Sequence, residues 1–363
     1  MIGKAGNIQQ IGEPFQLTVS IIVVNYNSGT KLSRCLKSVN QTKLVAETEV
    51  IVVDNASTDG SADIVDKKFP GITLIRNHKN LGYGAGNNIG AAHAKGKYLA
   101  FLNPDTVIQS DWLISLVATL ESNTRIGLVT SKILMINQPG MINACGNDVH
   151  ISGLTLCRGF GKSNKDLNQL EEVCAVSGAA FLIRSNLYNM LGGFDEDFFL
   201  YMEDTDISIR SRLLGYKCYF VPDSVVYHDY VLNFSKQKTF FLERNRHLML
   251  LKSFRIGTIM VLFPILLLAE IVTWGYILLK DTKNYYNKIN AYIWILNNLN
   301  IMIAKRRTIQ NLRRISDREI LKLSLSRLEF EQTGDGLLAD FAHFIFDPLF
   351  GIFQRMVLLL VRW

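Results

Sequence analysis

The chain has 363 residues, of which 48% are hydrophobic and 20% are charged, with 26 glycines and 7 prolines. This composition excludes a disordered or collagen-like chain, and the length suffices for one large domain or two ordinary ones. The five cysteines are scattered, so we expect neither a disulfide framework nor a zinc knuckle, and a reducing compartment is the default. They are Cys35, Cys145, Cys157, Cys174 and Cys218.

The net charge of +7 is concentrated in the C-terminal third of the chain. Residues 1–230 carry 20 Lys and Arg against 22 Asp and Glu, whereas residues 231–363 carry 19 against 10. Because the basic part also holds long apolar runs, we expect it to meet a membrane surface and not nucleic acid. We therefore divide the chain into an N-terminal extension (1–17), a catalytic domain (18–230) and a basic, apolar helical region that associates with membranes (231–363).

The first hundred residues alternate between apolar strands and amphipathic helices. The expected strands are Val19–Val24, Val50–Val53, Ile72–Ile75 and Tyr98–Leu102. Nearly continuous apolar strands separated by helices are typical of a mostly parallel, Rossmann-like α/β sheet with both faces covered. The first apolar run is only six residues long, which favours a buried strand over a secretory signal, so we expect the protein to act in the cytosol.

Polar clusters follow three of these strands. They are Asn25-Tyr26-Asn27, Asp54-Asn55 and Asn103-Pro104-Asp105. Ligands bind outside the carboxyl ends of the strands in such sheets, so the chain order predicts a binding site where these clusters meet.

Residues 111–230 are expected to complete the same domain. We expect a helix near 112–120, a strand at Val176–Ile183, a loop at Asp195–Phe199, a helix from Glu203 to about Leu214, and short strands at Lys217–Val221 and Val225–His228.

Three apolar stretches follow residue 230. The run from Ile256 to Leu279 has one charge and one proline and is long enough to span a membrane. Basic residues flank both of its ends, so a spanning helix, a re-entrant or interfacial helix and a buried soluble helix all remain open. Ile289–Ala304 is too polar for a span, and 341–363 is typical of an interfacial helix. Arg244 and Arg246 either contact an acceptor phosphate or lie on a solvated helix face.

Four features carry candidate chemistry. Asp105, beside Asn103, would hold a divalent cation that bridges diphosphate oxygens, although Asn-Pro-Asp is also good turn chemistry. The acidic cluster Glu203-Asp204-Thr205-Asp206 supplies either a general base or a helix cap. His228 becomes a metal ligand only if the fold returns it to Asp105. The glycine-rich stretch 80–88 allows close approach of backbone to phosphate, but it is neither a dinucleotide fingerprint nor a P-loop.

Together, the motifs from Val19 to His228 resemble the inverting glycosyltransferases of family 2, which have the GT-A fold, and their rhamnosyltransferase-like subgroup. In chain order they are VSIIVVNYNSGTKLSRCLKSV, EVIVVDNASTDGS, NLGYGAGNNIG, YLAFLNPDTVI, VSGAAFLIR, LGGFDEDFFLYMEDTDISIRSRLLGYK and VYH. The resemblance implies donor-binding roles for Asn25, Tyr26, Asn27, Asp54, Asn80, Gly82, Gly86, Asn87 and Asn103.

The same resemblance implies that Asp105 and His228 hold Mg²⁺ or Mn²⁺, and that Asp204 is the general base with Glu203 beside it. The first acid of the family's D-x-D motif is Asn103 here, which lowers the charge available to a metal. Leu359 replaces the glutamine of the Q-x-x-R-W motif, which favours a single addition over a polymerase.

The implied reaction moves a sugar from a nucleotide-diphosphate donor, with dTDP-rhamnose as the first candidate, to a lipid-linked glycan acceptor. It would serve cell-surface polysaccharide synthesis at the cytoplasmic face of the cell membrane. A catalytically degenerate nucleotide-sugar-binding scaffold and a sugar-nucleotide pyrophosphorylase are the alternatives.

Overall fold

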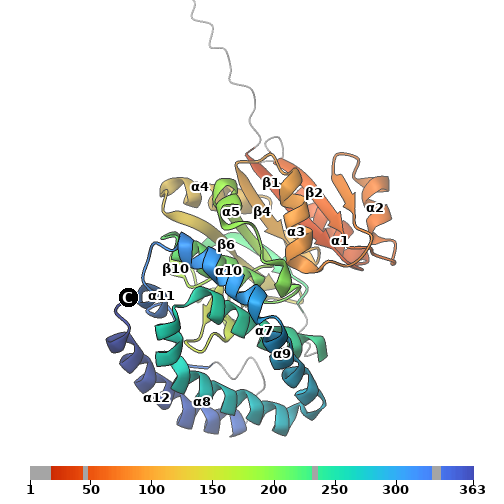
Figure 1. Ribbon diagram of the computed structural model, residues 1–363. Coiled ribbons are helices and arrows are strands. Elements are labelled where there is room, and N and C mark those ends of the chain that lie inside the picture. The colour runs from red at the N-terminus through yellow and green to blue at the C-terminus, as the bar shows by residue number, and fades with distance from the viewer. Residues whose placement is uncertain (1–17, 44–47, 231–235, 329–336) are drawn as a thin grey trace, which may run out of the picture.

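The computed structural model describes residues 18–43, 48–230, 236–328 and 337–363, so the expected N-terminal extension lies outside the described part (Figure 1). The strands are β1 (Val19–Asn25), β2 (Thr48–Asp54), β3 (Thr73–Arg76), β4 (Tyr98–Leu102), β5 (Thr106–Ile108), β6 (Ile126–Met135), β7 (Gln138–Ala144), β8 (Asn147–Val149), β9 (Thr155–Cys157), β10 (Glu171–Val173), β11 (Ala180–Arg184) and β12 (Lys217–His228).

The α-helices are α1 (Thr30–Val39), α2 (Ser61–Lys68), α3 (Gly82–His93), α4 (Trp112–Ser122), α5 (Ser185–Leu191), α6 (Glu203–Leu213), α7 (Lys236–Ser253), α8 (Ile256–Lys280), α9 (Tyr285–Asn297), α10 (Leu299–Leu312), α11 (Asp317–Leu321) and α12 (Leu337–Leu360). Two short 3₁₀ helices are η2 (Glu196–Phe198) and η3 (Thr282–Asn284).

The central sheet is mixed, with the order β10-β12-β6-β11-β4-β1-β2-β3, and β5 and β7 pair at its side with β12 and β6. Strands β1 to β4 are parallel, as expected from the alternation of strands and helices. Strand β11 then runs antiparallel between β4 and β6, while β12 is parallel to β6. The N-terminal half of the sheet is therefore parallel, whereas the other half combines the parallel β6–β12 pair with antiparallel partners, so the sheet as a whole is mixed.

Alternate residues of β1 face two different helical layers. Val19, Ile21 and Val23 pack with residues of α1, α2 and α4, whereas Ile22 and Val24 lie on the face covered by α3. Successive side chains of a strand point to opposite faces, so burial on both sides requires the continuous apolar run seen in this strand. Because β1, β2 and β4 are parallel, their carboxyl ends lie at the same edge of the sheet.

Three boundaries differ from the sequence prediction. Strand β11 begins at Ala180, not at Val176. The two short strands expected at 217–228 are one strand with a register shift between Val221 and Val225. Pro222 stands in that interval and has no N–H for the ladder, which accounts for the irregularity without ending the strand.

The glycine-rich stretch is mostly helix, since α3 already begins at Gly82. A Cβ on Gly86 would lie 2.8 Å from Val24 Cγ1, and one on Gly90 would lie 2.5 Å from Ile22 Cγ2. These two glycines therefore let α3 approach β1 closely, which is a packing role.

The C-terminal helices pack directly against the sheet domain. Helix α7 contacts α6, α8, α9 and α10, and α8 lies along α12, so that α8, α9 and α12 form an open arc (Figure 1). One hydrophobic cluster joins Phe198 and Met202 to Leu248 and Met249 of α7. The parts before and after residue 230 therefore share a core.

Among the residues that the structure describes, two helices are long and apolar enough to cross a membrane by length and composition, namely α8 and the segment His343–Leu360 of α12. Most of each lies outside the core. The apolar run at 289–304 is divided between α9 and α10, consistent with its expected unsuitability as a span.

Replacing Gly90 with Ala should destabilise the protein by about 1–3 kcal/mol, because the new methyl group would overlap Ile22. Gly275→Ala is the matched control, since Gly275 also lies in a helix and a Cβ there would meet no heavy atom within 4 Å, so helix propensity should leave this variant equal or more stable. Urea unfolding followed by circular dichroism measures both, and equal midpoints for the two variants would contradict the packing role.

Candidate active site

A cavity of about 460 Å³ lies between the edge of the sheet and helices α7 and α8. Asn103, Glu203, Asp204 and His228 line it from the sheet domain. These four residues come from parts of the chain that are far apart in the sequence, and they were expected to act on the same substrate. In the structure they line the same cavity.

Asp105 and His228 are paired beside this cavity. Asp105 lies in the turn between β4 and β5, and His228 ends β12, which pairs with β5. Asp105 Oδ1 is 3.2 Å from His228 Nε2, while His228 Nδ1 lies 2.9 Å from Asn143 Oδ1. Burial raises the pKa of Asp105, but the hydrogen bond and charge of His228 outweigh it, so the pKa lies below its ordinary value.

The donor atoms of this pair suit a divalent cation. A carboxylate oxygen, an imidazole nitrogen and the nearby amide of Asn103 are ligands that Mn²⁺ accepts, and the oxygens suit Mg²⁺. From the sequence, His228 could be a metal ligand only if the fold brought it close to Asp105. In the structure the two side chains are in contact, so this condition is met.

Asp204 lies at the start of α6 and is held by hydrogen bonds. Its Oδ2 accepts from the N–H of Gly178 at 2.7 Å and from Asn147 Nδ2 at 2.9 Å, and its Oδ1 accepts from the N–H of Thr205 at 2.6 Å. Burial raises the pKa of Asp204 above its ordinary value, although these donors lower it in part. The carboxylate is therefore oriented, half-buried and in contact with the cavity.

Glu203 differs from its neighbour, since its Oε2 is buried without a hydrogen-bond partner. Burial first and the charge of Asp204 second raise the pKa of Glu203 to about 8. Glu203 therefore keeps its proton near neutral pH, and the pair carries one negative charge, on the carboxylate that has the donors.

The backbone before this pair is strained. Phe199, Tyr201 and Met202 have φ values of 59°, 68° and 66°, in the left-handed region that non-glycine residues rarely adopt. Asn245 of α7 lies within hydrogen-bond distance of three carbonyl oxygens of this segment, at 3.0, 2.9 and 2.7 Å. A side chain from the C-terminal region thus fixes the loop that leads to Asp204.

Buried ion pairs fix the same loop. Lys252 of α7 is fully buried and contacts both Asp195 and, at 2.8 Å, Asp206. Lys305 of α10 pairs with Asp195 and Asp197. Burial raises the pKa of Asp195, but the two lysines outweigh it and hold the pKa well below its ordinary value. We define Lys252, Lys305, Asp195, Asp197 and Asp206 as the loop clamp.

Only some of the residues that were expected to bind the donor are exposed. Tyr26 is 50% exposed and Asn27 is also exposed, so both are accessible at the edge of the sheet. Asn25, Asp54 and Asn87, also expected at the donor site, are buried. Asn25 Nδ2 donates to Asp54 Oδ1 at 2.7 Å and to Ser61 Oγ at 2.9 Å, and Asn87 Nδ2 donates to the carbonyl of Tyr83.

The remaining predicted donor residues lie near the turn into α3. Asn80 Oδ1 accepts from the N–H of Gly82 at 2.9 Å. Gly82 has a φ of 85°, and a Cβ there would lie 2.3 Å from the carbonyl oxygen of Phe199. Gly82 is therefore required by the strained loop that precedes Glu203.

Arg244 and Arg246 are both buried, so neither expectation for them holds. Arg244 donates to the carbonyl oxygens of Asp197 and Phe198. Arg246 pairs with Glu243 at 2.7 Å and with Glu270 of α8. Both guanidinium groups are occupied within the protein.

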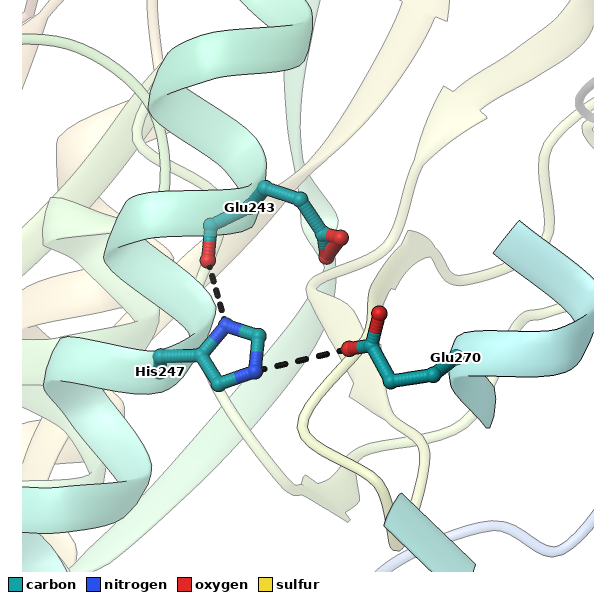
Figure 2. Close-up of side chains that lie close together, drawn as sticks. All are labelled: Glu243, His247 and Glu270. Carbon is teal, nitrogen blue, oxygen red and sulfur yellow. Dashed lines mark hydrogen bonds and ion pairs between the residues drawn. The ribbon is translucent and has the colours of Figure 1, made fainter. Parts of the chain in front are cut away.

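Glu243, His247 and Glu270 lie close enough to suggest a second cation site, with one ligand atom from each within 4.8 Å of the others (Figure 2). However, Lys288 Nζ already contacts Glu243 Oε2 at 2.5 Å and Glu270 Oε2 at 3.0 Å, and Arg246 contacts both carboxylates. The negative charge is therefore balanced by protein cations, and the cluster is an ion-pair network that joins α7, α8 and α9.

Comparison with known proteins gives a family for the sheet domain. Residues 20–189 match the family model described as glycosyl transferase family 2. The chain is 27% identical over 235 residues to the N-acetylglucosaminyl-diphospho-decaprenol L-rhamnosyltransferase of Mycobacterium tuberculosis, which covers 57% of this chain and 75% of that protein.

Two solved structures share the fold. S. aureus TarS 1–349 in complex with UDP-GlcNAc superposes with a TM-score of 0.54 and 18% identity, over 94% of this chain and 90% of that one. GalNAc-T7 with UDP, GalNAc and Mn²⁺ gives a TM-score of 0.52 and 23% identity over 63% of this chain, which spans about half, 48%, of GalNAc-T7.

Residues 20–189 are therefore a family 2 glycosyltransferase domain, and the protein is a glycosyltransferase with the GT-A fold. This result favours a transferase over the pyrophosphorylase alternative.

Lys252→Met should lower the free energy of unfolding by about 1.5–3 kcal/mol, because it removes charge-assisted contacts to two buried carboxylates, although Asp195 keeps Lys305 and Asp206 keeps Arg210 as partners. Lys43→Met removes an exposed ion pair with Asp111 and should cost less than about 1 kcal/mol. Chemical denaturation compares the two variants, and similar small losses would show that the loop clamp contributes little.

Glu203→Gln should reduce the loss of stability that accompanies rising pH. The stabilisation from the proton on Glu203 is complete below its unfolded pKa of 4.5 and is lost as the pH rises through about 8. The melting temperature of the wild type should therefore fall more between about pH 5 and about pH 9 than that of the variant. Exposed Glu319→Gln serves as the control, and parallel pH profiles for wild type and Glu203→Gln would rule out the protonated state.

Proposed function

We propose that the protein transfers a sugar from a nucleotide-diphosphate donor to a hydroxyl group of a lipid-linked acceptor, with inversion at the anomeric carbon. The observation that carries the proposal is the single cavity shared by Asp204 and His228, with Asp105 paired behind the histidine. A base on one wall and a cation site on the other are what one in-line displacement requires.

Asp105 and His228 would hold Mg²⁺ or Mn²⁺, and the bound ion supplies positive charge that stabilises a leaving diphosphate. Asp204 accepts the proton of the acceptor hydroxyl. The hydroxyl oxygen forms a bond to the anomeric carbon from the face opposite the diphosphate, and the bond from that carbon to the diphosphate oxygen breaks. Protonated Glu203 leaves Asp204 as the single negative charge of the pair.

The candidates for the donor and the acceptor come from the similarity to the mycobacterial relative. The mycobacterial relative is named for rhamnosyl transfer to a lipid-linked diphosphate, so dTDP-rhamnose and an acceptor of that class are the first candidates. Tyr26 is exposed at the carboxyl end of β1, and we propose that its ring stacks on the nucleotide base. A panel of nucleotide sugars, scored by thermal stabilisation, identifies the donor.

Asp204→Asn should lower the turnover number by at least about 100-fold while leaving donor affinity nearly unchanged, because a general base contributes about 10²–10⁴-fold. The control Asp63→Asn removes an exposed carboxylate of α2 that forms a surface pair with Arg76. Release of nucleoside diphosphate measures turnover, and near-wild-type turnover in Asp204→Asn would remove this residue from the role.

We propose that α8 and α12 rest on the cytoplasmic face of the membrane. One side of α8 is buried at Leu262, Ile265 and Ala269, whereas Met260 and Phe263 are 70% and 63% exposed. A helix with one face in the protein core and the other apolar and exposed suits the membrane interface.

Met260→Lys combined with Phe263→Lys should weaken binding to phosphatidylglycerol vesicles at least about tenfold, since burial of each side chain contributes roughly 1.5–3 kcal/mol. Ile114→Lys changes an exposed apolar residue of α4 and should leave vesicle binding unaltered. Co-sedimentation provides the readout, and retention of the double variant on vesicles argues against this face.

A further inference from the structure

We propose that the part of the cavity bordered by α7 and α8 binds the apolar chain of the acceptor, and that Lys238 contacts the phosphate that joins this chain to the sugar. The inference rests on the proposed function for the sugar end of the acceptor. It adds a binding site for an isoprenoid-type phosphate and names the residues that recognise it.

Most of the lining surface of the cavity is apolar. Asp204, Glu203 and His228 line it from the sheet side, whereas the opposite elements contribute Leu242 from α7 and Val272 and Ile277 from α8. The polar Thr239, Glu243, Thr273, Tyr276 and Asp281 also line it there. Leu154 and Leu156 add further apolar surface. Reaction at a sugar hydroxyl uses only the sheet side, so the apolar part bordered by α7 and α8 fits a different portion of the substrate. An amphipathic molecule with its sugar at Asp204 would cover both.

Lys238 of α7 is the candidate phosphate ligand. Of the Lys and Arg side chains in the described ranges, it alone lines the cavity. Its Nζ is 5.5 Å from the ring centre of Tyr201, two residues from Glu203, and Leu242 follows one helical turn later on the same face of α7. Burial lowers the pKa of this ammonium group, and a phosphate would offset that loss of hydration.

Helix α8 borders the cavity and the exposed apolar surface at once. Val272 and Ile277 face the cavity, while their neighbours Ile271 and Leu278 are 55% and 59% exposed. A chain that occupies the apolar part therefore lies one helix away from the surface proposed to meet the membrane. This proximity favours a lipid as the occupant over a free sugar phosphate.

Equilibrium dialysis of the full-length protein with labelled farnesyl phosphate, farnesol and inorganic phosphate tests the inference. The variants are Val272→Trp, which fills the apolar part, and Lys238→Met, which removes the ammonium group and keeps the stem. Ile271→Trp is the matched control, because it adds the same side chain to the exposed face of α8.

We expect Val272→Trp to raise the dissociation constants of farnesyl phosphate and farnesol at least about tenfold, and Ile271→Trp to leave them within about twofold. Lys238→Met should raise the constant for farnesyl phosphate about tenfold and leave that for farnesol nearly unchanged. Inorganic phosphate should bind far more weakly than farnesyl phosphate.

Three results would overturn the inference: no binding of farnesyl phosphate to the wild type, equal effects of Val272→Trp and Ile271→Trp, or equal affinity for inorganic phosphate. Hydrolysis of a nucleotide sugar by each variant is measured in parallel to confirm folding, and Leu242→Trp replaces Val272→Trp if that variant does not fold. Absence of hydrolysis in the wild type would contradict the proposed function, whereas the dialysis result still decides whether the lipid site exists.

Discussion

The contact between the Lys252 ammonium group and the carboxylates of Asp195 and Asp206 is the constraint on which the site depends. All three groups are buried, and buried charges are tolerated only while their partners stay in place. The loop that leads to Asp204 therefore cannot leave α7 without uncovering charges. Because its strained backbone also depends on Asn245, the C-terminal helices are a structural part of the active site as well as a proposed membrane contact.

The two acidic residues of the site have different environments although they are neighbours. Asp204 receives three short hydrogen bonds, whereas one oxygen of Glu203 has none. Burial penalises both charges, so the residue with donors retains the negative charge and the other retains its proton. This division gives a single base at the cavity that His228 also lines, and the loop clamp holds the segment that leads to that base.

The sequence predicted the parallel half of the sheet, because its apolar runs constrain it. The meeting of Asp105 with His228 was only implied by the family resemblance, because nothing in the pattern of either segment fixes how β12 returns to β5. The sequence did not predict β6, whose Thr130, Ser131 and Lys132 interrupt the apolar pattern of a central strand. It also did not predict the burial of Asn25, Asp54 and Asn87, because a polar residue at a strand end has the same pattern whether it meets a ligand or supports a neighbour. The sequence did not predict the buried position of Lys252, because a lysine in a basic helix ordinarily lies on a solvent-exposed face.

Hydrogen–deuterium exchange of the full-length protein tests most directly whether the C-terminal helices and the catalytic loop are one unit. The account predicts that the amides of residues 195–204 exchange as slowly as those of the second half of α7, and that both become exposed together as denaturant is added. Rapid exchange of 195–204 while α7 stays protected would contradict it.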